Sequence, residues 1–275
     1  MELRRIFDTI PDQFDRYRPR YSRELFDHLI NYAGIGPGKE VLEIGPGTGQ
    51  ATDPVLETGC SYCAIELGEN LCGKMTGKYG SYPNFRIIND DFITHDFGGQ
   101  RFDMVYAAAA MQWIPEETAF TKTFSLLKPG GVLAMMLTRS DYRTPNEGLY
   151  NKIQKLYDIY FKPEIPYTHG GFRYSAAPEY GFEGFEELHF HGRREMDPDE
   201  YAAYCGTHSD HIVIPPSDTS LHQSGFRDSQ ENAASHTYHN HQCRLRIDFS
   251  YILNYTSFFA VKFHLYKFHL DFLNF

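Results

Sequence analysis

The sequence predicts an α/β fold built on a mostly parallel, doubly wound sheet. Short apolar runs of strand length alternate with longer segments of helical spacing through the first half of the chain. Strands that alternate with helices favour βαβ units, whose crossovers keep neighbouring strands parallel. The first run, residues 41–44, leads into a glycine-rich turn, and a helical pattern follows at once. Further strand-like runs begin near Tyr62, Phe85 and Phe102, and Pro129-Gly130 is a turn signal that precedes another strand.

The glycine-rich turn predicts a nucleotide-like ligand. Gly45, Gly47 and Gly49 occupy alternate positions in V-L-E-I-G-P-G-T-G-Q. Glycine lets the backbone adopt positive φ or approach a ligand closely, and the helix behind the turn presents free N–H groups to it. The spacing is neither the dinucleotide pattern G-x-G-x-x-G, because position 50 is glutamine, nor a phosphate-binding P-loop.

Acidic residues follow the second and third runs. Glu66 ends the run at residues 62–67, about 20 residues after the turn, where a carboxylate can accept from both ribose hydroxyls. The alternative is a solvated glutamate at a strand end. Asp90, Asp91 and Phe92 follow the run at residues 85–88.

These features, in this order, resemble the motifs of class I S-adenosylmethionine-dependent methyltransferases of the small-molecule type, similar to methyltransferase domains 11 and 25. The loop spacing is E-x-G-x-G-x-G, residues 102–113 read F-D-x-V followed by small residues and an aromatic, and residues 126–133 resemble the entry to the fifth strand. The resemblance covers about residues 10–210. It implies a Rossmann-like sheet of about seven mostly parallel strands with helices on both faces, and S-adenosylmethionine as the cofactor.

The resemblance also implies site residues. Asp91 with Phe92 matches the position that reads the adenine amino group, and Asp90, one place off, stays open. Tyr17 is expected near the methyl group and Arg18 near the methionine carboxylate. No single residue must act as a base, so the catalytic candidates are Tyr17, Gln112 and Trp113. The implied cofactor-binding residues are Glu43, Gly45, Pro46, Gly47, Gly49, Glu66, Leu67, Asp91, Phe92, Ala107 and Ala108.

Four segments are expected along the chain. Residues 1–36 form an N-terminal cap over the cofactor, with a helix at 22–32 capped by Ser22. Residues 37–140 form the cofactor-binding core. Residues 141–216 form a lid and complete the sheet, with a helix at 146–161, a sixth strand at 185–196, and a helix at 197–207 capped by Asp197.

Residues 217–275 form an atypical tail. This tail holds one of the chain's 23 glycines, Gly225, and none of its 15 prolines. The family's glycine turn and closing strand are not recognisable there, and only residues 245–253 suit a strand. We therefore expect a tail that departs from the family, disordered or non-native through a frame change, and a sheet without its usual edge.

Composition restricts the partners. The net charge of −10 and the lack of a basic run argue against nucleic acid, so a small-molecule acceptor is expected. No apolar run is long enough for a membrane span, and residues 1–5 do not resemble a secretory signal. The odd count of five cysteines suits a reducing compartment, which predicts a cytoplasmic protein. The oligomeric state is left open.

No metal is expected, although three patterns invite one. They are the C-x-x-C of Cys60 and Cys63, the T-H-S-D-H stretch at 207–211, and the histidine-rich residues 236–243. The T-H-S-D-H stretch is more simply a wall of the acceptor pocket. The function predicted is methyl transfer to a small molecule. The alternatives are a protein or RNA methyltransferase, and a cofactor-binding protein made inactive by its C-terminus.

Overall fold

The computed structural model describes residues 2–140, 171–192, 196, 198–213 and 254–262, together with the helical residues 148, 151, 154, 155 and 158. Most of the helix expected at 146–161, and the expected cap Asp197, lie outside these residues. Within this part of the chain, no helix is both long enough and apolar enough to cross a membrane.

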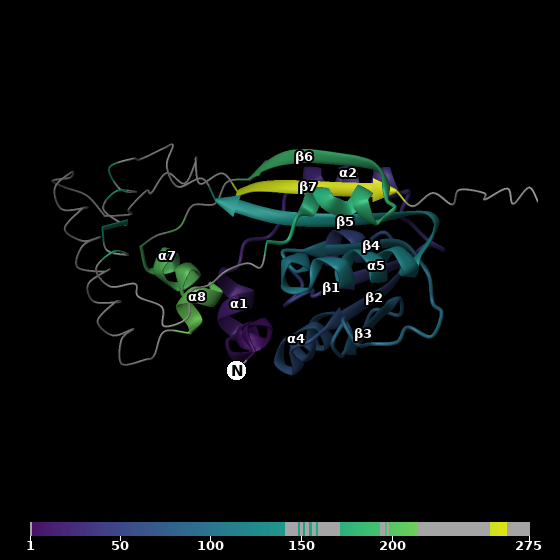
Figure 1. The fold of residues 1–275 in the computed structure, drawn as a ribbon. Helices are drawn as coiled ribbons and strands as arrows, with labels where there is room; N and C mark the ends of the chain where they lie inside the picture. The colour runs from purple at the N-terminus through teal and green to yellow at the C-terminus, as the bar shows by residue number, and fades with distance from the viewer. Residues whose placement is uncertain are drawn as a thin grey trace, which may run out of the picture.

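A twisted sheet with strand order β3-β2-β1-β4-β5-β7-β6 forms the centre of the molecule (Figure 1). The strands from β1 to β5 pair in parallel, as helical crossovers require, whereas β7 runs antiparallel to both β5 and β6. The predicted α/β class with a mostly parallel sheet is therefore confirmed. The strands are β1 (Glu40–Ile44), β2 (Ser61–Glu66), β3 (Phe85–Asn89), β4 (Phe102–Ala108), β5 (Leu127–Ser140), β6 (Glu183–Gly192) and β7 (Asn254–Lys262).

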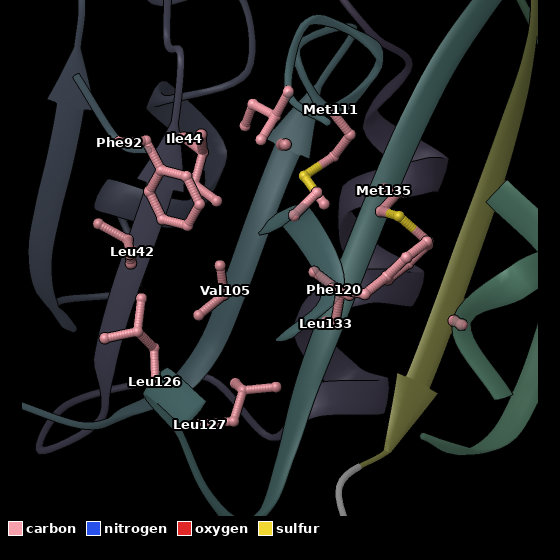
Figure 2. Close-up of a cluster of buried hydrophobic side chains, with 14 of the residues drawn as sticks. Leu42, Ile44, Phe92, Val105, Met111, Phe120, Leu126, Leu127, Leu133 and Met135 are labelled. Carbon is pink, nitrogen blue, oxygen red and sulfur yellow. The ribbon is translucent and has the colours of Figure 1, made fainter. Parts of the chain in front are cut away.

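Helices bury both faces of the sheet. One face packs against α2 (Arg23–Ala33), α3 (Asp53–Leu56) and α4 (Glu69–Tyr79). The other packs against α5 (Glu116–Leu126) and η3 (Tyr174–Tyr180), and Figure 2 shows Leu42, Val105 and Leu133 of this cluster. The strands β1, β4 and β5 are consequently buried on both sides and largely apolar, which is typical of a covered parallel sheet.

Short helices gather at the carboxyl edge of the parallel strands (Figure 1). They come from the N-terminus, as η1 (Leu3–Thr9) and α1 (Pro11–Tyr17), from the segment after β4, as η2 (Met111–Trp113), and from α7 (Pro198–Cys205) and α8 (Ser209–Ile212). The expected helix near residues 22–32 is confirmed as α2, with the Ser22 hydroxyl accepting from the Leu25 amide at 3.3 Å.

Three expectations for the second half of the sheet need correction. Pro129 and Gly130 lie inside β5 rather than before it, at a register shift where a bulge absorbs the turn signal. The sixth strand begins at Glu183 rather than at Phe185 and is described as far as Gly192, and residues 193–195 lie outside the described residues.

The third correction concerns the tail. It contributes β7, which lies between β5 and β6, although the family's glycine turn and closing strand were not recognisable in the tail sequence. The segment suggested for that strand, residues 245–253, lies outside the described residues.

We predict that a chain ending at residue 216 will lose cooperative thermal unfolding. Removing β7 leaves the backbone donors and acceptors of β5 and β6 without their ladder, and unpaired buried backbone groups are costly. A chain ending at residue 262 keeps β7 and is the matched control. Circular dichroism melting of both proteins is the measurement, and equal melting curves would show that β7 adds nothing to stability.

Candidate functional site

A cavity of about 420 Å³ lies at the carboxyl ends of the parallel strands. Its position matches the general rule for open α/β sheets, because the strand order reverses between β1 and β4. Its volume is typical of a small-molecule site. The predicted residues that line it are Gly45, Pro46, Gly47, Glu66, Leu67, Asp90, Asp91, Phe92, Ala108, Gln112, Trp113 and Arg18.

The glycines of the loop after β1 are required by backbone geometry and by space. Gly45 and Gly47 have φ values of 62° and 61°, in the left-handed region. A Cβ atom on Gly47 would lie 2.9 Å from the Phe14 ring, and one on Gly45 would lie 2.8 Å from the Ala110 Cβ. The loop can therefore bring its backbone to the cavity only with glycine at these positions.

The Glu66 carboxylate joins this loop to the end of β2. Its Oε2 accepts from the Gly47 amide at 3.0 Å, and its Oε1 accepts from the Gly68 amide at 2.9 Å. Burial disfavours the charged form and raises the pKa of Glu66 to about 7, although both amides oppose the shift. The carboxyl group predicted from the sequence thus lines the cavity and is held rigidly there.

The two acids after β3 have different partners. Asp91 accepts a bidentate pair from the Arg4 guanidinium at 3.0 and 2.9 Å, and this hydrogen bonding lowers its pKa. Asp90 instead contacts the His95 ring at 2.7 Å. Phe92 is buried beside Asp91 and gives the cavity an apolar wall. The sequence analysis missed Arg4, whose Arg-Arg-x-Phe context carries no helical or binding signature.

Two aromatic rings contact Arg18, which also lines the cavity. Its guanidinium lies 5.7 Å from the Phe7 ring centre and 5.2 Å from the Phe14 ring centre, and its Nη2 donates to the Thr207 carbonyl at 2.6 Å. Phe7 also meets Trp113 edge to face, with ring centres 5.4 Å apart. The N-terminal segment therefore brings Arg18 and Trp113 to the same part of the cavity.

The three catalytic candidates are not brought together. Gln112 is fixed by two hydrogen bonds: it donates to the Ala109 carbonyl at 2.9 Å and accepts from the Tyr174 hydroxyl at 2.7 Å. Gln112 and Trp113 line the cavity, whereas Tyr17 does not. Tyr17 packs against a cluster around α7 that includes Tyr201.

Three implied cofactor residues also lie outside the lining of this cavity. Ala107 is buried in the cluster that includes α5. Gly49 contacts the Tyr79 ring, which would lie 2.7 Å from a Cβ atom added at Gly49. Glu43 is fully buried on the α2 side of the sheet, where it accepts from the Thr52 hydroxyl at 2.7 Å. Side chains alternate along β1, so the residue before Ile44 faces away from the ligand side.

The T-H-S-D-H stretch forms part of the cavity wall, as expected. His208, Ser209 and Asp210 line the cavity. Burial and the nearby Arg18 charge lower the pKa of His208 to about 3, so the ring is neutral at physiological pH. The sequence analysis missed Thr138 and Tyr204 as lining residues, although Thr138 lies near the carboxyl end of β5. Cys60 and Cys63 lie in clusters on opposite faces of the sheet.

Comparison with known proteins identifies the class of domain. Residues 41–131 match the family model described as "Methyltransferase domain". The resemblance to class I S-adenosylmethionine-dependent methyltransferases is confirmed, and the chain carries a methyltransferase domain over these residues.

Solved structures support the fold. Phosphoethanolamine N-methyltransferase 2 of Haemonchus contortus, bound to phosphomonomethylethanolamine and S-adenosylhomocysteine, superposes with a TM-score of 0.53 at 14% identity, covering 96% of this chain and 61% of that chain. A second structure of the same enzyme, bound to S-adenosyl-L-methionine, gives a TM-score of 0.52 at 15% identity and covers 94% of this chain and 57% of that chain. At such identities the likeness establishes the fold alone.

A curated relative is more similar in sequence over a shorter stretch. Ribosomal RNA small subunit methyltransferase A of Thermosynechococcus vestitus is 37% identical over 75 residues, which is 27% of this chain and 28% of the relative. The match to the curated relatives thus spans about a quarter of their length.

We predict that Gly49→Ala will destabilise the protein by about 2–4 kcal/mol, because it combines backbone strain with overpacking against Tyr79. Gly38→Ala is the matched control, since Gly38 has a similar φ of 82° and open space around its Cβ position. We expect it to cost only about 1 kcal/mol. Urea unfolding of both variants measures the difference, and equal losses would refute close packing behind the loop.

Proposed function

We propose that this chain binds S-adenosylmethionine in the cavity and transfers its methyl group to a nucleophile on a small molecule. The observation that carries the proposal is the Glu66 carboxylate held 3.0 Å from the Gly47 amide at one cavity. Ribose hydroxyls can donate to such a carboxylate, while the glycine loop leaves room for a ligand. The methyltransferase domain over residues 41–131 supports the same interpretation.

The residues present fit the cofactor along the whole cavity. Phe92 offers an apolar wall for the adenine ring, and Asp91 keeps a lone pair on Oδ2 for its amino group beside the Arg4 pair. Gly45, Pro46, Gly47 and Ala108 approach the amino-acid portion with small or absent side chains. Arg18 offers a cation for the carboxylate of that portion. Residues 1–36 would then act as the cap.

The chemistry that the protein must supply is orientation. S-adenosylmethionine carries an activated methyl on a sulfonium centre. The chain has to hold a nucleophile in line with this methyl and exclude water, and orientation of this kind can contribute roughly 7–11 kcal/mol. Trp113 and Gln112 line the cavity beside Ala109 and are held in place by Phe7 and Tyr174, so they are suited to position the acceptor.

His208 is suited to accept a proton from a hydroxyl acceptor. Its Nδ1 lies 3.1 Å from the Cys205 carbonyl. A carbonyl oxygen only accepts, so Nδ1 carries the proton, and Nε2 of the neutral ring has a lone pair that can accept one. Transfer of a methyl group to a neutral hydroxyl would leave an oxonium, R–O(H)–CH3+, which is a very strong acid, so even an imidazole of low pKa could take its proton and leave the neutral ether.

The acceptor is proposed to be small because the protein is acidic and the cavity has the size of a small-molecule site. A nucleic acid normally requires a basic surface, whereas this chain has a net charge of −10. The Haemonchus contortus enzyme likewise holds a small molecule, phosphomonomethylethanolamine, in its solved complex. The second candidate is an RNA acceptor, favoured by the names of the curated relatives, which the chain matches over only part of their length.

The proposal predicts that the protein binds S-adenosylhomocysteine with one-to-one stoichiometry and does not bind NADH. Calorimetric titration of each ligand is the measurement. Folded protein that fails to bind S-adenosylhomocysteine would refute the assignment. Binding without any methyl transfer across a broad panel of small molecules and RNA would instead favour an inactive, cofactor-binding protein.

We predict that Glu66→Gln will weaken S-adenosylhomocysteine binding about 10- to 100-fold, because it removes a charged acceptor from the ribose and leaves an amide N–H against a backbone N–H. Glu69→Gln, on an exposed side chain three residues away, is the matched control. Calorimetry measures both, and an unchanged affinity for Glu66→Gln would remove Glu66 from the cofactor site.

For a hydroxyl acceptor, we predict that His208→Ala lowers kcat by about 10²- to 10⁴-fold, in line with loss of a general base. Affinity for S-adenosylhomocysteine should stay the same, because His208 is assigned to the acceptor. His189→Ala, outside the cavity lining, is the control. Steady-state kinetics would contradict the assignment if only KM changed.

A further inference from the structure

A buried polar cluster lies directly behind the glycine-rich loop, outside the cavity lining. Glu43 on β1 is in register with Tyr106 on β4, and Tyr62 extends from β2 toward both. Thr52, just after the loop, completes the cluster. All four side chains are at most 1% exposed. Polar groups so deeply buried are costly unless their hydrogen bonds are satisfied, so this arrangement requires an explanation.

The cluster connects Glu43 to the backbone of the loop. The Tyr62 hydroxyl is hydrogen-bonded to Glu43 Oε2, and the two tyrosine hydroxyls are hydrogen-bonded to each other. The Tyr106 hydroxyl then donates to the Ala51 carbonyl at 3.2 Å. Ala51 follows the loop directly and lines the cavity. The chain of hydrogen bonds therefore runs from a carboxyl group inside the sheet to the wall of the cofactor cavity.

Counting protons assigns the state of Glu43. The cluster contains three hydrogen bonds in series: Glu43 to Tyr62, Tyr62 to Tyr106, and Tyr106 to the Ala51 carbonyl. Each tyrosine hydroxyl has one proton to donate, and a carbonyl oxygen has none. Two phenol protons cannot fill three hydrogen bonds, so the third proton must come from the carboxyl group. With Glu43 protonated, every link has one donor and one acceptor.

A second observation agrees with the proton count. Among the described residues, Glu43 Oε1 has no hydrogen-bond partner, and it is fully buried. An ionised oxygen in this position would be far more costly than a neutral carbonyl oxygen. Burial raises the pKa of Glu43 to about 7, although hydrogen bonds that Tyr62 and Thr52 can donate to the ionised form oppose this shift.

We propose that Glu43, as the neutral acid, is a positioning residue that holds the cofactor loop through Tyr62, Tyr106 and the Ala51 carbonyl. The proposal rests on cofactor binding at this cavity, and it gives Glu43 a role without contact with the ligand. Ionisation of Glu43 removes one proton from this series of hydrogen bonds. One of the three hydrogen bonds is then lost, and the backbone after the loop loses a restraint.

The sign of the pH dependence depends on two carboxyl groups. The acid form of Glu43 favours the loop, so this contribution is complete at low pH and is lost as pH rises through about 7. Glu66 acts in the opposite direction, because its ionised form is the better acceptor for ribose, and its pKa is also about 7. The Glu43 charge also raises the pKa of Glu66, so wild type and the Glu43 variant are compared in a Glu66→Gln background, where the Glu66 titration is absent. The titratable groups around the cluster are Tyr62, Cys60 and Glu66 near β2, Tyr106 on β4, Asp53 on α3, Tyr79 on α4, and Tyr21 before α2.

Calorimetric titration with S-adenosylhomocysteine at several pH values between about 6 and 8.5 tests the proposal in the full chain. Glu43→Gln carries a permanent N–H donor in place of the acid proton, so it should match wild type at low pH. The affinity of wild type relative to Glu43→Gln should then fall about 2- to 10-fold as pH rises, the effect of one hydrogen bond. Tyr106→Phe should weaken binding by a similar factor at every pH, and the exposed Tyr82→Phe should not change it.

A constant ratio of wild type to Glu43→Gln across the pH range would overturn the proposal. So would an equal loss of affinity in Glu43→Gln and Tyr106→Phe at low pH. Infrared spectroscopy provides a readout that does not need the cofactor: in the Glu66→Gln background, protein with Glu43 at about pH 6 should show a buried protonated-carboxyl band that is lost when Glu43 is also replaced by glutamine. If the band is present but S-adenosylhomocysteine does not bind, the proposed function fails while the protonation state stands. If the band is absent, the assignment of a proton to Glu43 is wrong.

Discussion

The buried carboxyl group of Glu66 is the contact on which the shape of the cavity depends. It receives one backbone amide from the loop after β1 and one from the segment after β2, and so it fixes two strand ends relative to each other. The glycine loop can approach it because Gly45 and Gly47 adopt left-handed φ without a Cβ. Glu43 and Glu66 thus flank the same loop, one from behind and one from the ligand side.

Several polar contacts hold the N-terminal segment against the rest of the molecule beside the cavity. Asp8 accepts from the Leu71 amide at 2.9 Å at the start of α4, and Arg4 pairs with Asp91. Lys78 of α4 binds Asp15 and donates to the Thr48 carbonyl at 2.7 Å. Several of these contacts end on the loops that shape the cavity. The N-terminal segment and the loops around the cavity are therefore joined by a shared set of hydrogen bonds and ion pairs.

The sequence was sufficient to predict β1 to β4, because each strand is a short apolar run followed by a functional loop. The position of Glu66 at the cavity followed from the same rule, since parallel strands align their carboxyl ends. Side-chain orientation was harder to predict. Tyr17 and Glu43 stand next to cavity residues in sequence, yet Tyr17 packs toward α7 and Glu43 faces the α2 side of the sheet. Neither direction is determined by a motif.

Pairing between residues far apart in the sequence could not be predicted either. The strand β7 has no glycine turn before it, and its place between β5 and β6 depends on partners more than 60 residues away. Arg4 was missed for a related reason, because its partner Asp91 is 87 residues distant and Arg4 itself is part of no local pattern. His208 was found because the T-H-S-D-H stretch is compact, whereas its tautomer could be assigned only from the Cys205 carbonyl.

A crystal structure of the chain with S-adenosylhomocysteine would test the central claim most directly. The account predicts that the ribose hydroxyls donate to Glu66, that the adenine ring lies against Phe92, and that the homocysteine portion follows the glycine loop. The sulfur atom should then point toward Trp113 and His208. A ligand bound elsewhere, or one whose ribose makes no contact with Glu66, would contradict the account.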